Sequence, residues 1–340
     1  MIILRPAALS DISNLERLAH ESGPMVSTLP EKRSHLLNKV EQSIVSFEQD
    51  VDCAGEESYL FVLEETLTGQ VLGTGAVNAL AGNREPFYSF RNDIKVHSSR
   101  QLNVHSRIHA LTLNHDLSDH SQLCSFYIVP ALAETDYPTL ITLGRLLFMT
   151  IFPLRFANEW MAVLPGIADE SGRAPFWEHV GRKFFGIDYN QVEYYNSTRN
   201  STFISEMMPY HPLYVALIDE EAQAVMGLVH QNAALQCSLL SDQGFEADKH
   251  VEIFDAGPIL TAQRNALSLC QKVQQVKLTT ITDHVNANSL QTFLIGLAEG
   301  NSFKACLVQG GLQGNQLQLS EYNIDQLNLS SEHRVFCIKL

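Results

Sequence analysis

Hydrophobic and polar residues in the first 190 positions follow two periods, one typical of strands and one typical of helices. Residues 1–7 form a short apolar run, and residues 58–65 and 70–80 form two runs joined by a turn at Gly69, which predicts a hairpin. Apolar residues at three-to-four spacing predict helices. The other elements expected are helices over 9–22, 30–49, 138–156 and 174–188, and strands over 103–113, 122–129 and 160–167. We expect Ser10 or Asp11 to cap the first helix.

This order of elements indicates an α+β domain, with helices packed on a mainly antiparallel sheet. The pattern changes twice further along the chain. Residues 202–245 are mostly helical in pattern, and from about 250 short strands separated by Gly, Asn and Ser predict a small β-rich subdomain or barrel. We therefore divide the chain into a first domain over 1–195, a helical segment over 196–250 and a β-rich subdomain over 251–340.

Composition and charge argue against several classes of function. The chain has 340 residues and a net charge of −15, which disfavours nucleic acid as a partner because binding it needs a basic face. None of the six cysteines forms a C-x-x-C pair, so we expect reduced thiols and no metal site. The N-terminus does not resemble a signal peptide, and the apolar run at 140–152 is short and interrupted by Arg145. We expect a cytoplasmic protein that does not bind a membrane.

Two groups of histidines need interpretation. Four of them are closely spaced on expected strands and a loop without metal-ligand spacing: His105, His109, His115 and His120. His230 differs, because it directly precedes an expected helix in "MGLVHQNAALQCSLLSDQGFE". It is either a histidine bonded into the turn that starts that helix or a group that transfers protons, since imidazole exchanges protons near neutral pH.

Three stretches together resemble the arginine N-succinyltransferase family. They are "APFWEHVGRKFF" (174–185), "FISEMMPYHPLY" (203–214) and "EAQAVMGLVHQNAALQCSLLSDQGFE" (221–246), and "FDAGP" (254–258) supports them. The resemblance covers most of the chain and is weakest over its last 60 residues. It implies a fold of the GNAT acyltransferase superfamily and transfer of succinyl from succinyl-CoA to the α-amino group of L-arginine.

The resemblance also implies roles for particular residues. His230 matches the proton donor of the family, and Phe126 matches a contact to succinyl-CoA made through the backbone of the strand at 123–129. Taken from its own sequence context, Phe126 is equally a core residue on a half-buried strand. Succinyl-CoA is a co-substrate in this interpretation, with no bound cofactor or metal. The partners are small-molecule substrates and, in a homo- or hetero-oligomer, related chains.

An arginine substrate needs carboxylates for its guanidinium group, because that planar cation pairs with a carboxylate through two hydrogen bonds. Four acidic residues are candidates, and the sequence does not choose among them: Asp116, Asp169, Glu170 and Asp255. No Ser or Cys stands in a recognised nucleophile motif, so we expect the amine to attack the thioester directly.

One stretch departs from the superfamily pattern. The loop that usually holds the coenzyme pyrophosphate is rich in glycine, but "PALAETDYPTLITLGRLLF" has none before Gly144. It also contains Glu134, Asp136 and Pro138, which add negative charge and remove an N–H donor. The alternative function is therefore a non-catalytic or regulatory relative that has lost pyrophosphate binding, or an acyltransferase for another amine.

Overall fold

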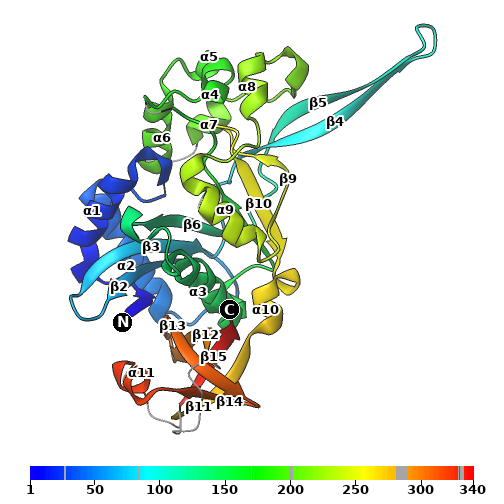
Figure 1. The fold of residues 1–340 in the computed structure, drawn as a ribbon. Helices are drawn as coiled ribbons and strands as arrows, with labels where there is room; N and C mark the ends of the chain where they lie inside the picture. The colour runs from blue at the N-terminus through cyan, green and yellow to red at the C-terminus, as the bar shows by residue number, and fades with distance from the viewer. Residues whose placement is uncertain are drawn as a thin grey trace.

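A computed structural model describes residues 1–26, 28–82, 85–169, 171–198, 202–280, 290–327, 329 and 333–340. Its central sheet crosses the molecule from the N-terminal strand to a long projecting hairpin (Figure 1). The strands, in spatial order, are β1 (Ile2–Pro6), β2 (Ser58–Glu65), β3 (Gln70–Asn78), β6 (Ser121–Ile128), β7 (Glu159–Val163), β10 (Pro258–Gln263), β9 (Glu246–Val251), β4 (Ser89–Ser99), β5 (Val104–Asn114) and β8 (Leu213–Tyr214). Neighbours in this part are antiparallel except β6 and β7, which are parallel.

Helices cover both faces of the β1–β6 half of the sheet. On one face, Leu60 and Val62 of β2 share a core with α1 (Ile12–Ser22) and α2 (Arg33–Glu48). On the other face, Tyr59 and Phe61 share a core with α3 (Tyr137–Ile151). Because both faces of β2 are buried, its sequence is a continuous apolar run rather than an alternation. The expected mixture of helices on a mainly antiparallel sheet is confirmed.

Glycines allow α3 to approach the sheet closely. A Cβ atom on Gly75 of β3 would lie 2.9 Å from the Nε atom of Arg145, and one on Gly144 of α3 would lie 2.5 Å from a methyl group of Leu4. Gly144 therefore serves helix-to-sheet packing and does not belong to a phosphate loop.

Two expectations about helices are wrong in detail. Neither Ser10 nor Asp11 caps α1 through its side chain; Asp11 instead accepts the N–H of Ala8 at 2.8 Å and pairs with Arg5. The helix expected over 174–188 is broken into α4 (Pro175–His179) and α5 (Arg182–Phe185). The break falls at Gly181, where a Cβ atom would lie 2.1 Å from the Trp177 ring, so the indole packs against bare backbone.

Between residues 189 and 272 the helices are short. The helices are α6 (Tyr189–Thr198), α7 (Thr202–Met207), α8 (Glu220–Val225), α9 (Ala234–Ser241) and α10 (Ser268–Lys272). In Figure 1, α4 to α8 gather at one end of the molecule, and α9 lies beside β10.

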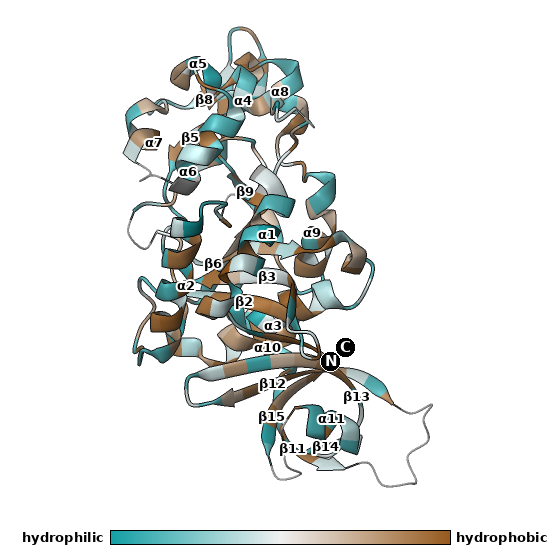
Figure 2. Cartoon of the chain, turned by 90° about the vertical axis from the view of Figure 1, so that its left-hand side faces the viewer, coloured by the Kyte–Doolittle hydropathy of each residue, from teal (hydrophilic) through white to brown (hydrophobic). Residues whose placement is uncertain are grey.

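A closed five-stranded barrel forms the other end. Its strands and helix are β11 (Gln274–Thr280), β12 (Gln291–Glu299), β13 (Ser302–Gln313), β14 (Gln316–Leu319), β15 (Arg334–Lys339) and α11 (Glu321–Gln326). The ring closes because β12 pairs with both β13 and β15, and β13 pairs with β1 of the central sheet. Figure 2 shows apolar residues along these strands, which enclose a core of their own.

The β-rich C-terminal structure expected from the sequence is thus a barrel, built from β11 to β15. β10 pairs with β7, so residues 258–263 lie in the central sheet and not in the barrel. The division at 195 and 250 stays a prediction. In the part of the chain that the structure describes, no helix has the length and apolar character to cross a lipid bilayer.

Candidate functional site

Strands β6 and β7 diverge in the middle of the central sheet. Their pairing runs only from Ser121 opposite Trp160 to Leu123 opposite Ala162. Just beyond that point Ser125 has a φ of 52°, and the register between β6 and β3 shifts. A bulge of this kind bends a strand and redirects its side chains and amides. The N–H of Ser125 donates to Thr28 Oγ1 at 2.8 Å, which fixes the bend.

A buried arginine, Arg145, stabilises the bend in β6. Arg145 of α3 is fully buried and donates to the carbonyls of Ala76 at 3.1 Å and Cys124 at 3.0 Å, which are paired residues of β3 and β6 next to the bulge. Burial lowers the pKa of its guanidinium to about 10. The Arg145 that interrupts the apolar run in the sequence therefore satisfies carbonyls that the irregular β3–β6 pairing leaves exposed inside the protein.

The gap between the diverging strands opens into a pocket of about 560 Å³, within the range of small-molecule sites. Residues 122–128 of β6, Phe126 included, line one wall, and residues 163–165 that follow β7 line the opposite wall. Gln231, Asn232 and Ala233 close one side. The strand at 123–129 is therefore a wall of the pocket, and Phe126 is one of its lining residues.

His230 lies at the edge of this pocket. Its own N–H donates to the carbonyl of Pro165 at 2.9 Å, and its Nδ1 accepts the N–H of Asn232 at 3.2 Å. Both Pro165 and Asn232 line the pocket, whereas His230 does not. The turn predicted at the start of the helix is thus present, and these hydrogen bonds hold it beside the pocket. In the neutral ring, this bond leaves the proton on Nε2.

Carboxyl groups also line the pocket. Glu252, Asp255 and Glu193 line it together with Tyr189. Asp255 accepts the N–H groups of Gly166 and Gly257, both at 2.7 Å, and the hydroxyl of Tyr189 at 3.2 Å. Glu252 accepts the N–H of Asp255 at 2.8 Å. These contacts make the cluster a fixed part of the protein.

Burial and mutual repulsion shift the pKa values of this cluster. Burial raises the pKa of Glu252 well above its usual range, and the charges of Asp255 and Glu193 add to the effect. Burial also raises the pKa of Asp255, and burial followed by the Asp255 charge raises the pKa of the Tyr189 hydroxyl. A cation placed among these groups would favour their charged forms. The part of the pocket lined by this carboxyl cluster is therefore suited to a positively charged group.

Of the three acidic candidates that the structure describes, only Asp255 lines the pocket. Asp116 pairs with Arg91 beside the projecting hairpin, and Asp169 accepts hydrogen bonds within its own turn, which lower its pKa. Glu170 lies outside the described residues. The sequence analysis missed Glu252, Glu193 and Tyr189, although "EIFD" places Glu252 one turn before Asp255.

The closely spaced histidines are separate from the pocket. His105 and His109 lie on β5, His115 is exposed, and His120 lies between Asp119 and Glu159. None of these four lines the pocket.

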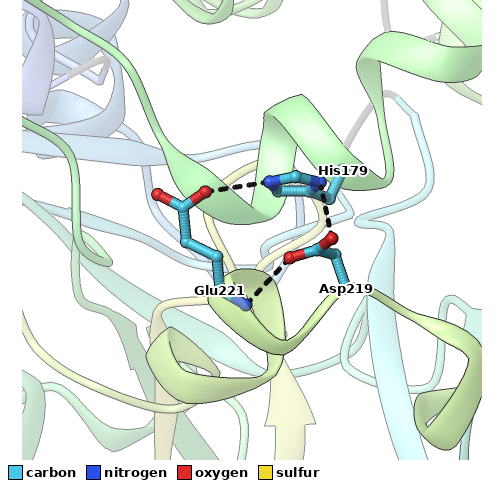
Figure 3. Close-up of side chains that lie close together, drawn as sticks. All are labelled: His179, Asp219 and Glu221. Atoms are coloured by element: carbon cyan, nitrogen blue, oxygen red, sulfur yellow. Dashed lines mark hydrogen bonds and ion pairs between the residues drawn. The ribbon is translucent and has the colours of Figure 1, made fainter.

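A second polar cluster joins α4 to α8. His179 contacts Glu221 at 3.0 Å and Asp219 at 3.8 Å (Figure 3), and among the described residues this is the one trio close enough to share a cation. Arg173, however, donates to both oxygens of Glu221 at 2.6 and 2.7 Å. These bonds, followed by the one from His179, lower the pKa of Glu221 to about 2. The cluster is an ion-pair network that holds two helices together.

A turn rich in acidic residues connects the pocket to α3. Pro130 and Ala133 of this turn line the pocket, and Glu134 and Asp136, both exposed, follow immediately. Asp136 does not cap α3 through its side chain, and proline occupies the first turn of the helix. The helix N-terminus that would face a pyrophosphate is therefore close to the pocket but bordered by two carboxyl groups.

The fold and the pocket define a mixed α and β protein with a pocket of small-molecule size between two diverging strands. A family profile described as "Arginine N-succinyltransferase beta subunit" matches residues 2–269. The chain belongs to the arginine N-succinyltransferase family.

Relatives match along nearly the whole chain. Arginine N-succinyltransferase subunit alpha of Pseudomonas aeruginosa is 39% identical, over 91% of this chain and 90% of the relative. Arginine N-succinyltransferase of Yersinia enterocolitica is 32% identical, over 100% of this chain and 98% of the relative. The solved structure of arginine/ornithine succinyltransferase subunit AI from Pseudomonas aeruginosa superposes with a TM-score of 0.91 at 35% identity, covering 100% of this chain and 98% of that one.

Proposed function

We propose that this chain is an acyltransferase that moves the succinyl group of succinyl-CoA to the α-amino group of L-arginine, a reaction of arginine catabolism. The observation that carries the proposal is the pocket between β6 and β7, which is lined by a strand edge and by buried carboxyl groups. Family membership supplies the acyl donor and the amine. The divergence of two parallel strands supports a GNAT-type acyltransferase fold.

In this proposal the thioester lies along β6, and the amine substrate binds beside Glu252 and Asp255. Backbone N–H groups near Phe126, beyond the last β6–β7 pair, would donate to the thioester oxygen as it gains negative charge. Glu252 and Asp255 would hold the guanidinium, and the neutral α-amine would face the carbonyl carbon. Fixed donors and fixed carboxylates need little reorganisation during the reaction.

The chemical step is direct. The amine nitrogen forms a bond to the carbonyl carbon, the carbon–sulfur bond breaks, and the departing thiolate takes a proton. His230 is the proposed proton donor, through Nε2 of its imidazolium form. Because that form carries protons on both ring nitrogens, the bond that Nδ1 accepts from Asn232 is broken in it. The amine nitrogen loses one proton to solvent when the substrate ammonium becomes the neutral nucleophile, and a second proton when the amide forms. The second proton balances the one that His230 delivers to sulfur, so the reaction releases one proton overall.

The names of the relatives include alpha and beta subunits, so we propose that the chain acts within a multi-subunit enzyme. The use of succinyl-CoA is consistent with the cytoplasmic location expected from the sequence.

Glu134 and Asp136 beside the pocket favour the second candidate, a relative that no longer binds coenzyme. Calorimetric titration with succinyl-CoA and with CoA separates the two. An acyltransferase gives saturable heat at submillimolar ligand. A variant with a filled pocket, Ala133→Phe, should lose that heat, while Ala131→Phe on the exposed side of the same turn should keep it. Absence of heat and of thermal stabilisation in the unmodified protein at millimolar ligand would establish the non-catalytic function.

A further inference from the structure

The β4–β5 hairpin leaves the body of the protein as a two-stranded ribbon (Figure 1). Its cross-strand pairs continue in one register from Ser89 opposite Asn114 to Ser99 opposite Val104. At the base, β4 pairs with β9 through Phe90 and Arg91, and β5 pairs with β8 through Ala110 and Leu111. Beyond the base, neither strand has a further strand neighbour among the described residues. We call residues 94–109 the arm.

The arm exposes apolar side chains along its length. Ile94, Val96, Leu102 and Val104 are 54%, 58%, 74% and 52% exposed. Residues two apart on one strand share a face, so Ile94 and Val96 form one face of the ribbon with Arg107 and His109 opposite them. Val104, which pairs with Ser99, lies on the other face. An isolated two-stranded hairpin is marginally stable in water, and apolar residues gathered on a surface mark contact sites. Exposed apolar side chains on an isolated hairpin are typical of an element that a partner covers.

The charge of the arm is opposite to that of the remaining chain. The arm contains Lys95, Arg100 and Arg107 and no Asp or Glu. The whole chain carries −15, so removing the three positive charges of the arm leaves −18 for the remaining residues. A basic, partly apolar ribbon on an acidic protein is complementary to the surface of that same protein.

One segment matches the arm in both properties. Residues 41–57, which end α2 and lead to β2, contain six carboxylates and no Lys or Arg: Glu41, Glu48, Asp50, Asp52, Glu56 and Glu57. The first four of these are exposed, and Val45 among them is 60% exposed. This segment, which we call the acidic segment, offers both an apolar contact and negative charge.

We propose that the arm docks on the acidic segment of a second copy of this chain. A reciprocal arrangement, in which each arm contacts the other copy, gives a closed dimer with two identical contacts. Nucleic acid is a poorer match for the arm, because the negative charge of the remaining chain would repel a polyanion. The proposal is independent of the acyl transfer, since neither the arm nor the acidic segment lines the pocket.

Charge reversal tests the contact. The molar mass of the unmodified protein, measured by sedimentation velocity or light scattering in 0.1 M salt, should be that of an oligomer and should fall at 1 M salt. The arm variant Lys95→Glu/Arg107→Glu should weaken association at least about tenfold. The segment variant Glu48→Lys/Asp50→Lys/Asp52→Lys should do the same. A matched control, Lys249→Glu/Lys272→Glu, changes net charge equally on exposed residues elsewhere and should leave association unchanged.

Mixing the two reversed variants gives the sharpest result. The arm variant carries negative arms and the segment variant carries positive segments, so the mixture should form a mixed oligomer at 0.1 M salt although each alone does not. A monomeric unmodified protein, an arm variant that remains oligomeric, or reversed variants that fail to combine would each overturn the proposal. Thermal unfolding of the variants near the temperature of the unmodified protein verifies that they are folded.

Discussion

Glu252 and Asp255 are held in a place that does not favour their charges. Backbone N–H groups stabilise them, yet burial raises the pKa of both carboxyl groups. Residues with such conflicting surroundings are common at functional sites, where the missing partner arrives with the ligand. Here a guanidinium would provide the missing positive charge.

Glu252→Gln should raise the KM for arginine about 10- to 100-fold, because a hydrogen bond to a charged partner contributes about 1.5–3 kcal/mol. The turnover number should change much less, since the thioester and His230 are untouched. In the unmodified protein, KM should fall as pH rises, because the carboxyl groups must lose protons to pair with the cation. Initial rates over a range of arginine and pH measure both effects. Glu321→Gln, exposed on α11, is the matched control.

The same substitution has a predictable effect on stability. The pKa of Glu252 is higher in the folded than in the unfolded protein, so the folded state binds its proton more tightly. Stability contributed by that proton is present at low pH and is lost as pH rises through the folded-state pKa. At pH 8, Glu252→Gln should therefore not lower the midpoint of thermal unfolding. A marked fall in that midpoint would show that a raised KM reflects damage to the fold.

The sequence identified part of this site. The resemblance places His230 and Phe126 at the edge and the wall of the pocket, respectively, and Asp255 is one of the four acidic candidates. Glu252 was missed because, apart from the nearby Asp255, the cluster depends on residues distant in sequence; Glu193 and Tyr189 reach it only through the packing of α6. Periodicity describes local structure and does not show which distant carboxylates meet.

Two turns cross at the base of the carboxyl cluster. A Cβ atom on Gly257 would lie 2.2 Å from the carbonyl oxygen of Leu164 and 2.5 Å from the nitrogen of Gly166. The preceding Ala256 has a φ of 57°, a conformation that glycine adopts more easily. Ala256 of "FDAGP" is thus held in a strained conformation, and the glycine after it is needed for the close backbone approach.

Gly257→Ala should lower the free energy of unfolding by about 3 kcal/mol, because backbone atoms rather than a flexible side chain oppose the added methyl group. Denaturant titration measures the change. Gly311→Ala in the barrel is the comparison, since its Cβ atom would meet only a side-chain oxygen at 3.6 Å. Equal effects of the two substitutions would contradict the crossing described here.

The elements themselves were well anticipated where they have a buried face. β2, β3, β6 and α3 follow their apolar patterns. β4 was missed because most of its length is in the ribbon, where few residues are buried and no alternation develops. The bulge at Ser125 was also not predicted, because it depends on Thr28 and Arg145 from other parts of the chain.

The central sheet connects three parts of the molecule: the barrel, the pocket and the arm. The barrel joins it through β13 and β1, the pocket opens where β6 and β7 part, and the arm leaves from its far edge. The sequence indicated the barrel from its short strands and the α+β character from the order of elements. It did not indicate that β9 and β10 return to the central sheet, because strand partners far apart in the chain leave no local pattern.

Formation of N-succinylarginine from succinyl-CoA and L-arginine tests the central claim most directly, with thiol release and product mass followed together. Thiol release should require arginine and match product one to one. His230→Ala should reduce turnover about 10²- to 10⁴-fold with the fold intact, and His20→Ala, exposed on α1, should not. Undiminished thiol release by His230→Ala, or no succinylated product from the unmodified protein, would contradict the account.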